Sequence, residues 1–143
     1  MYCPFCSHSE TRVLESRIAD DALRRRRECE KCSARFTTYE KAVFSLTVIK
    51  KDGREQPFQI EKIRNSVVKS LGKGEEESIT AITQKIEHKI LAKKTNSIKT
   101  TDIGKVVMQE LKRVDKMAYL RFATIHKSIE DPKLLRKELE IIT

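Results

Sequence analysis

Four cysteines form two identical pairs near the start of this chain of 143 residues, Cys3-x-x-Cys6 and Cys29-x-x-Cys32. Each Cys-x-x-Cys turn can place two sulfur atoms on one side of a metal ion, and zinc favours four thiolates in a tetrahedron. The 22 residues between the pairs slightly exceed the common spacing, but a hairpin between the pairs would absorb the excess. The pattern predicts one structural zinc ion per chain, held by all four cysteines.

Two disulfide bonds or four free thiols are the alternative interpretation of these cysteines. The chain opens with Met1-Tyr2-Cys3-Pro4 and shows neither the basic nor the apolar segment of a secretion signal, so we expect a cytoplasmic location. In that compartment paired cysteines are more often metal ligands than disulfides. A redox role for one pair is disfavoured because no thioredoxin-like βαβ pattern surrounds it. His8 could compete as a ligand, but four cysteines already complete the set.

A block of four arginines, Arg24 to Arg27, precedes the second cysteine pair. Such charges repel one another unless a polyanion neutralises them, and arginine offers bidentate contacts to phosphates and to guanine. On a strand, Arg24 and Arg26 would face one way and Arg25 and Arg27 the other. A solvated charged face is the alternative, but a metal-held ribbon would fix these side chains in space. We therefore predict contact with nucleic acid through Arg12, Arg17, Arg24, Arg26, Arg27 and Arg35.

The net charge of the whole chain is +9, from 30 Lys and Arg against 21 Asp and Glu, which fits a polyanionic partner. Its distribution does not identify the site of contact, because residues 1–40 carry a net charge of +1 and the remainder carries +8. The prediction of nucleic-acid binding therefore rests on the local arginine cluster. No apolar run approaches the roughly 20 residues that span a bilayer, so we expect no membrane partner.

Three lysines form a weaker candidate site in the second half of the chain. Lys50, Lys51 and Lys62 could converge where a hairpin meets a helix, and their ammonium groups could hold a triphosphate. No Gly-x-x-x-x-Gly-Lys loop is present, so this would not be a P-loop site. From the chemistry alone, solvated surface lysines are the favoured interpretation.

The elements that must position these residues change in character near Lys41, where cysteine disappears and apolar residues begin to repeat at helical spacing. Before this point the sequence predicts short strands around a turn at Asp20-Asp21, at residues 12–17, 24–28 and 35–39. About 40 residues are too few to build a stable apolar core, so this part needs its metal.

Beyond Lys41, the pair Asp52-Gly53 predicts a two-residue hairpin turn between strands at 47–51 and 54–58. Apolar stripes then predict helices at about residues 60–71, 79–90, 103–114, 116–130 and 132–139. Gly72 can end the first of these, and Asp131-Pro132 is a suitable start for the last. The expected fold class is α+β, a small β zinc ribbon followed by a mostly helical domain with a β-hairpin.

Taken in order, these motifs resemble the bacterial ribonucleotide reductase transcriptional repressor family (NrdR) over nearly the full chain. The similarity lies in segments from both halves of the chain: Cys3-Pro4-Phe5-Cys6, Thr11-Arg12-Val13, Arg24 to Cys29, Arg35 to Glu40, Val48 to Gly53, Pro57-Phe58 and Ala118 to Ala123.

The resemblance implies a regulator and not an enzyme. It implies a zinc ribbon at residues 1–45 that binds double-stranded DNA, an ATP-cone domain at 46–136 that binds ATP or dATP, and a C-terminal tail at 137–143. The implied role is repression of ribonucleotide reductase genes, with nucleotide-controlled homo-oligomers. Lys50, Lys51 and Lys62 would contact phosphates. Val48, Ile49, Phe58 and Tyr119 would shape the base and ribose pocket, although Tyr119 could instead belong to the core.

Three residues at nucleotide-binding positions depart from the family pattern. Lys51 replaces the usual arginine, which keeps the charge and loses the bidentate fork. Gln56 replaces glutamate, which removes a charged acceptor, and His126 replaces tyrosine. We expect these changes to alter the affinity and selectivity for nucleotides.

Two other functions compete with the repressor. ATP-cones also resemble the regulatory ends of ribonucleotide reductases, but the chain leaves no room for a catalytic barrel and all four cysteines are assigned to zinc. A zinc ribbon could alternatively bind RNA or RNA polymerase. Competition between duplex DNA and RNA would separate that function from operator binding.

Overall fold

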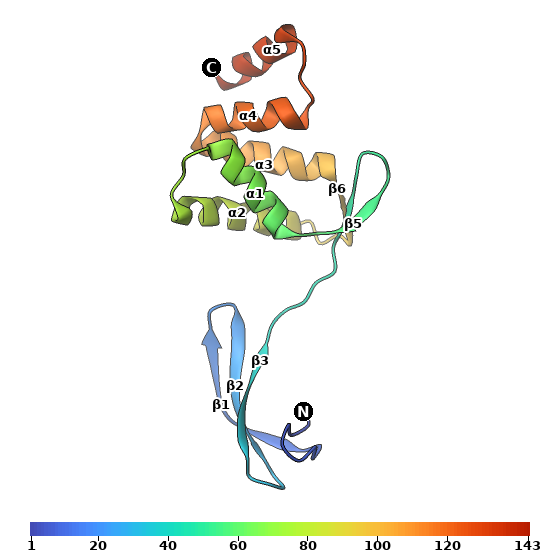
Figure 1. Ribbon diagram of the computed structural model, residues 1–143, viewed down its shortest axis with the longest axis vertical. Coiled ribbons are helices and arrows are strands. Elements are labelled where there is room, and N and C mark those ends of the chain that lie inside the picture. Colours follow the sequence, from blue (N-terminus) through green and yellow to red (C-terminus); the bar gives the residue numbers. More distant parts are fainter. The chain divides into compact units, whose positions relative to one another are not determined.

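Six strands and five helices make up the computed structural model, which describes residues 1–143 (Figure 1). The elements fall into two units, Met1–Phe44 and Ser45–Thr143. The first unit contains only strands and the second is mostly helical, which confirms the α+β class expected from the sequence. None of the helices is both long enough and apolar enough to cross a membrane.

The first unit is an antiparallel sheet of three strands in the order β1-β2-β3. The strands run over the three segments expected from the sequence and extend slightly beyond them: β1 (Thr11–Ala19), β2 (Ala22–Cys29) and β3 (Arg35–Glu40). Asp20 and Asp21 form the turn between the paired residues Ala19 and Ala22. Asp20 has a φ of 55°, a left-handed conformation that aspartate tolerates better than most residues.

The second unit begins with a small mixed sheet in the order β5-β4-β6. The hairpin of β4 (Thr47–Ile49) and β5 (Glu55–Pro57) has a wider loop than expected, because regular pairing ends at Ile49 and Glu55. Gly53 has a φ of 87°, which glycine adopts without strain. The third strand, β6 (Ser97–Lys99), pairs parallel with β4 and was not expected, because three residues are too short to show a period.

The predicted apolar stripes form the core of the second unit. Val67, Ile86, Val107 and Leu111 are at most 1% exposed. The helices that contribute them and their neighbours are α1 (Ile60–Leu71), α2 (Glu76–Leu91), α3 (Thr100–Val114), α4 (Lys116–His126) and α5 (Pro132–Ile142).

The last two helices differ from the expected boundaries. The helix expected at 116–130 ends at His126, and Ser128 adopts a left-handed φ of 50° that a helix cannot continue through. The last helix runs on to Ile142, which is only 6% exposed, so residues 137–143 are not a separate tail. Burial of Ile142 extends this helix because it places an apolar side chain against the core.

Candidate functional site

The four cysteines come together at one end of the β1–β3 sheet, with all their sulfur atoms within 4.8 Å of one another. The Sγ atoms of Cys3 and Cys32 are 3.7 Å apart, and those of Cys6 and Cys29 are 3.6 Å apart. A tetrahedron with zinc–sulfur bonds of about 2.3 Å has sulfur–sulfur edges of about 3.8 Å, whereas a disulfide bond is only about 2.05 Å long. The arrangement therefore fits one zinc ion with four thiolate ligands.

Backbone N–H groups around both cysteine pairs point at sulfur atoms, which stabilises the ionised thiolate form. The N–H of Phe5 points at Cys3 Sγ at 3.4 Å, and the N–H groups of Lys31 and Cys32 point at Cys29 Sγ at 3.4 and 3.5 Å. The hydrogen bond from Cys32 N–H is the main reason that the pKa of the Cys29 thiol falls to about 6, against the opposing effect of burial. Four cysteine side chains that converge in this way form a donor set that zinc favours, so their chemistry also fits the metal.

Strand pairing brings five of the six predicted DNA-contacting arginines to one face of the sheet. Arg17 pairs with Arg24, and Glu15 pairs with Arg26. Arg12 and Arg35 both pair with Glu28, one from each neighbouring strand. Directly paired residues of antiparallel strands share a face. We call this surface the arginine face: Arg12, Arg17, Arg24, Arg26 and Arg35, with Glu15 and Glu28 among them.

Arg27 lies on the opposite face, as the alternation along the strand predicted. Its side chain donates to the hydroxyl oxygens of Thr38, at 3.1 Å, and Thr11, at 3.4 Å. Both of these threonines belong to neighbouring strands, so Arg27 holds the sheet together from the side opposite the arginine face.

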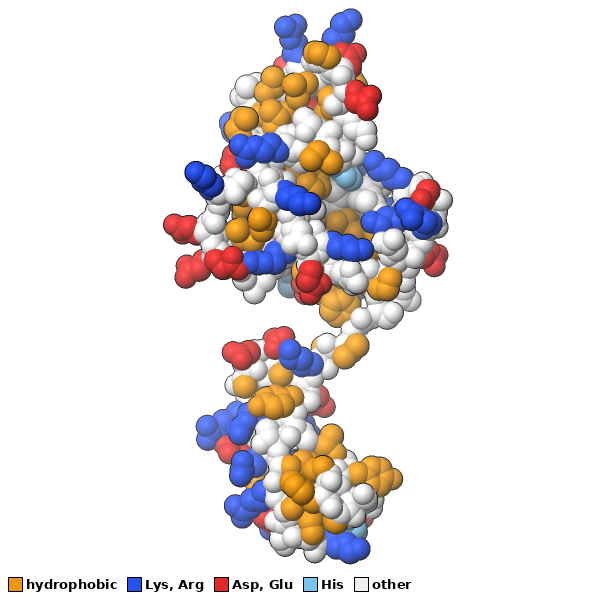
Figure 2. All heavy atoms as spheres, in the orientation of Figure 1, with side chains coloured by type: hydrophobic (Ala, Val, Ile, Leu, Met, Phe, Trp, Pro, Cys, Tyr) orange, Lys and Arg blue, Asp and Glu red, His pale blue; other side chains and the backbone are white.

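Glu28 is a buried carboxylate within the arginine face, with 9% exposure. It pairs with Arg12 and also accepts a hydrogen bond from Arg35 Nε at 2.9 Å. These two hydrogen bonds hold the pKa of Glu28 below its usual value. Glu15 pairs with Arg17, whereas Arg24 and Arg26 form no ion pair. Five guanidinium groups and two carboxylates leave this face with a formal charge of +3, and Figure 2 shows Lys and Arg side chains gathered along one side of the ribbon.

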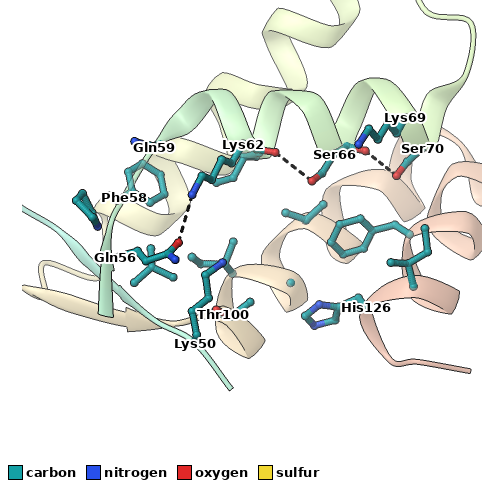
Figure 3. A pocket seen from close by; sticks show the side chains of 18 residues that line it. Lys50, Gln56, Phe58, Gln59, Lys62, Ser66, Lys69, Ser70, Thr100 and His126 are labelled. Carbon is teal, nitrogen blue, oxygen red and sulfur yellow. Dashed lines mark hydrogen bonds between the residues drawn. The ribbon is translucent and has the colours of Figure 1, made fainter. Parts of the chain in front are cut away.

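A pocket of about 380 Å³ lies in the second unit, between the hairpin and α1 on one side and α3 and α4 on the other (Figure 3). Its apolar walls come from Val48, Phe58, Ile63, Ile103 and Phe122. Three lysines and no carboxylate are among the lining residues: Lys50, Lys62 and Lys69. A pocket with apolar walls and several ammonium groups suits a ligand with a flat apolar part and an anionic part.

The pocket includes six of the nine nucleotide-binding residues expected from the sequence: Val48, Lys50, Gln56, Phe58, Lys62 and His126. The other three lie nearby in other roles. The Thr100 hydroxyl donates to the carbonyl oxygen of Ile49 at 3.2 Å, and Lys51 Nζ donates to the carbonyl oxygen of His126 at 3.0 Å. Tyr119 is buried against α5, where its hydroxyl donates to Glu138 at 2.8 Å.

Sequence reasoning missed several lining residues, and two signals could have found them. Ser66 and Lys69 follow Lys62 by four and seven positions on α1, so all three share one helical face. Gly104 interrupts the apolar stripe of α3, where glycine costs about 1 kcal/mol relative to alanine. A glycine at such a position can indicate that another group approaches the helix closely.

Comparisons with known proteins show which family the two parts of the chain resemble. Residues 1–40 match the family described as "Transcriptional repressor NrdR-like, N-terminal domain", and residues 46–132 match the family described as "ATP cone domain". A relative from Variovorax paradoxus, named "Transcriptional repressor NrdR", is 44% identical over 99% of this chain and 100% of its own length. The chain belongs to the NrdR family.

Further NrdR relatives cover similar lengths. The protein from Methylibium petroleiphilum is 44% identical over 91% of this chain and 92% of its own. The protein from Corynebacterium efficiens is 38% identical over 99% of this chain and 92% of its own. All are named as transcriptional repressors, which are regulators and not enzymes, in agreement with the sequence analysis. The cysteines and the arginine face belong to the NrdR-like region, and the whole pocket lies in the ATP-cone region.

Proposed function

We propose that this chain represses ribonucleotide reductase genes by binding double-stranded operator DNA, and that ATP or dATP controls this binding through the assembly of homo-oligomers. One observation carries the proposal: a single chain of the NrdR family combines an arginine-covered zinc ribbon with a lysine-lined pocket. The names of its relatives support the repressor role.

The arginine face is the proposed DNA-contacting surface. Arg24 and Arg26 carry no ion pair, so their guanidinium groups are free to bind phosphates or guanine edges. Arg12 and Arg35 share Glu28 and contribute less charge each. Arg27 is hydrogen-bonded to threonines on the other face and acts indirectly, by fixing the strands.

The pocket is the proposed site for ATP or dATP. Lys50, Lys62 and Lys69 would bind the phosphates, and Val48 and Phe58 would contact the base. Gln56 accepts a hydrogen bond from Lys62 Nζ at 3.2 Å, so the two side chains hold one another in position. The sequence analysis also assigned Ile49, Lys51 and Tyr119 to the ligand; we now propose that these three support the pocket walls.

Nucleotide can control DNA binding if its affinity differs between assemblies of the protein. A ribbon this small covers few base pairs, so one copy binds DNA weakly, and pairing copies at a fixed spacing raises the affinity through effective concentration. ATP and dATP differ by the 2′-hydroxyl, and one hydrogen bond with a buried partner is worth about 1–3 kcal/mol. That difference corresponds to roughly five- to a hundred-fold per site, which several sites in one oligomer would multiply.

The test is operator binding by the full zinc-loaded protein with no nucleotide, ATP, dATP or both, alongside light scattering. We expect dATP, alone or with ATP, to favour the DNA-binding oligomer, and ATP alone to favour an assembly that binds poorly. Lys62→Ala should reduce the effects of ATP and of dATP on assembly and on DNA binding, without loss of zinc. Identical masses and DNA affinities under all four conditions would exclude nucleotide control, and equal competition by RNA would exclude duplex DNA as the specific partner.

A further inference from the structure

His126, the last residue of α4, is held in the pocket wall by three elements. Its imidazole stacks on Phe122, one turn earlier on α4, with ring centroids 5.5 Å apart and an interplanar angle of 18°. It also lies directly against α3, because a Cβ added to Gly104 would come within 2.1 Å of the ring. Its backbone carbonyl accepts the hydrogen bond from Lys51 of the hairpin. Figure 3 shows the imidazole on the opposite side of the pocket from Ser66 and Ser70 of α1.

The charges around this imidazole are nearly all positive. Lys51 of the hairpin and Lys127, the residue after α4, are the charges that act on the ring. Lys50, Lys62 and Lys69 line the same pocket. The residues that α3 contributes to the pocket, Thr100, Ile103, Gly104 and Val107, carry no charge. Two carboxylates on the elements around the ring are paired with lysines: Glu138 of α5 with Lys127 at 2.5 Å, and Asp102 of α3 with Lys105 at 3.9 Å. Burial, followed by the charges of Lys51 and Lys127, lowers the pKa of His126, so the ring is neutral in the free protein near neutral pH.

We propose that His126 binds a proton when a polyphosphate ligand enters the pocket, and that this makes the pocket selective for phosphorylated ligands over nucleosides. A bound triphosphate neutralises the surrounding ammonium groups and adds negative charge beside the ring, so the imidazolium becomes the favoured form. A nucleoside brings no charge and leaves the ring neutral. The inference rests on the proposed function, since it requires that the pocket binds nucleotides.

The sign of the pH dependence follows from linkage. If the bound state holds the proton more tightly than the free state, the affinity for polyphosphate rises as pH falls through the interval between the two pKa values of His126. Each unit by which the ligand raises that pKa corresponds to up to a tenfold gain in affinity at the acidic end of this interval. Adenosine should show no such gain.

The experiment is calorimetric titration of the full zinc-loaded protein with ATP and with adenosine, each in two buffers of different ionisation enthalpy. Free ATP also titrates near pH 6, and this contribution is the same in every titration, so the difference between wild type and His126→Gln reports proton uptake at the ring and at the phosphate bound beside it. We expect wild type to take up a larger fraction of a proton with ATP than His126→Gln does. His88→Gln, which changes a histidine on α2 outside the pocket, should behave as wild type.

A second measurement does not depend on folding of the His126 variant. An NMR titration of wild type can follow His126 directly, because the only other histidines, His8 and His88, can each be assigned from their own variants. The His126 signal should titrate at higher pH with ATP than without it. If ATP binds with equal proton uptake in wild type and His126→Gln, or leaves the His126 titration unchanged, this inference is overturned while the proposed function stands. If neither ATP nor dATP binds wild type, this inference and the proposed nucleotide control are both overturned.

Discussion

Glu28 shows how single residues set the charge of the arginine face. It lies between Arg12 and Arg35 and remains ionised because both guanidinium groups lower its pKa. Two arginines are therefore oriented by an internal acceptor, while Arg24 and Arg26 have none. The carboxylate fixes the geometry of the face and, at the same time, reduces its attraction for a polyanion.

Replacing Glu28 by glutamine should therefore strengthen binding to DNA of any sequence. Glu28→Gln keeps the shape of the side chain, removes one negative charge and frees charge on Arg12 and Arg35. We expect the slope of log K against log salt to become steeper by up to about 0.9 for each additional phosphate that the arginine face neutralises. Fluorescence anisotropy with random duplex DNA over a salt series measures this change.

The matched control is Glu40→Gln, which makes the same change of charge on the opposite face, where Glu40 pairs with Arg25 at 3.6 Å. Its salt dependence should stay close to that of wild type. An equal effect of the two variants would show that DNA senses the net charge of the ribbon and not the arginine face.

The zinc ligands and the division of arginines between the two faces could be predicted because both depend on local rules: the Cys-x-x-Cys spacing and the alternation of a strand. The pocket could be predicted only in part. Lys51 and Lys50 are neighbours on the chain, yet only Lys50 lines the pocket, whereas Lys51 binds the carbonyl of His126. The direction of a side chain in a hairpin loop depends on the backbone geometry of the loop, which the spacing of residues in the sequence does not reveal.

At the scale of elements, α5 is the part that the sequence described least well. Its docking depends on a buried polar group: Glu138, 7% exposed, accepts hydrogen bonds from Tyr119 at 2.8 Å and Lys127 at 2.5 Å. Burial acts to raise the pKa of Glu138, but these two hydrogen bonds outweigh burial and lower it. A buried charge is stable only with such partners, and no periodic pattern reveals which residues supply them. Strand β6 was missed for a different reason, since it is stabilised by pairing with the distant β4.

Tyr119 should be the tyrosine that resists ionisation. Burial, followed by its hydrogen bond to Glu138, raises the pKa of Tyr119 to about 12. Because the fold favours the neutral form, this contribution to stability is complete below about pH 10, the usual tyrosine value, and is lost as pH rises toward 12. An ultraviolet titration should show one of the three tyrosines ionising only near pH 12, and Tyr119→Phe should lack that step.

The same variant should lower the free energy of unfolding of the second unit at neutral pH by about 1–3 kcal/mol, because Glu138 loses one partner while remaining buried. Tyr39→Phe is the control, since Tyr39 is 66% exposed and lies in the ribbon. Denaturant melts that give equal stabilities for both variants would mean that the Tyr119–Glu138 hydrogen bond contributes nothing to the docking of α5.

At the scale of the whole molecule, the two units are stabilised in different ways. The only buried apolar residues in Met1–Phe44 are Cys3, Ala22 and Cys29, two of which are zinc ligands. In Ser45–Thr143 the buried residues form one continuous hydrophobic cluster from all five helices and two strands. The metal therefore takes the place of a core in the ribbon, whereas the second unit has a core of its own.

Removal of zinc should unfold the ribbon alone. With a strong chelator we expect loss of amide protection in Met1–Phe44, while the helical circular dichroism and the thermal transition of the second unit remain close to those of the zinc-loaded protein. Addition of zinc under reducing conditions should restore the ribbon. Metal analysis that finds no zinc in a folded, reduced ribbon would contradict the assignment, as would joint melting of both units on chelation.

The connection between the units offers a test of whether they act as one regulator. Residues 41–46 join β3 to β4 without regular secondary structure, and all but Leu46 are exposed. A connection this short limits how far a ribbon can move from its own nucleotide-binding unit, and hence how well an oligomer can set the spacing of its ribbons. A longer connection should lower their effective concentration on DNA, roughly as the −3/2 power of its length.

We therefore expect an insertion of Gly-Ser residues after Val43 that doubles this connection to leave zinc content and nucleotide affinity unchanged, because neither site includes residues 41–46. Operator affinity in the presence of dATP should fall about threefold for each site brought together by the oligomer, since doubling a flexible length reduces effective concentration by about that factor. The difference in operator affinity between the protein with ATP and the protein with dATP should become smaller as well.

Adding the same residues after Thr143 controls for chain length. If operator binding is unchanged by the insertion, each ribbon binds DNA independently of the assembly, and nucleotide must act on DNA binding by a route other than ribbon spacing.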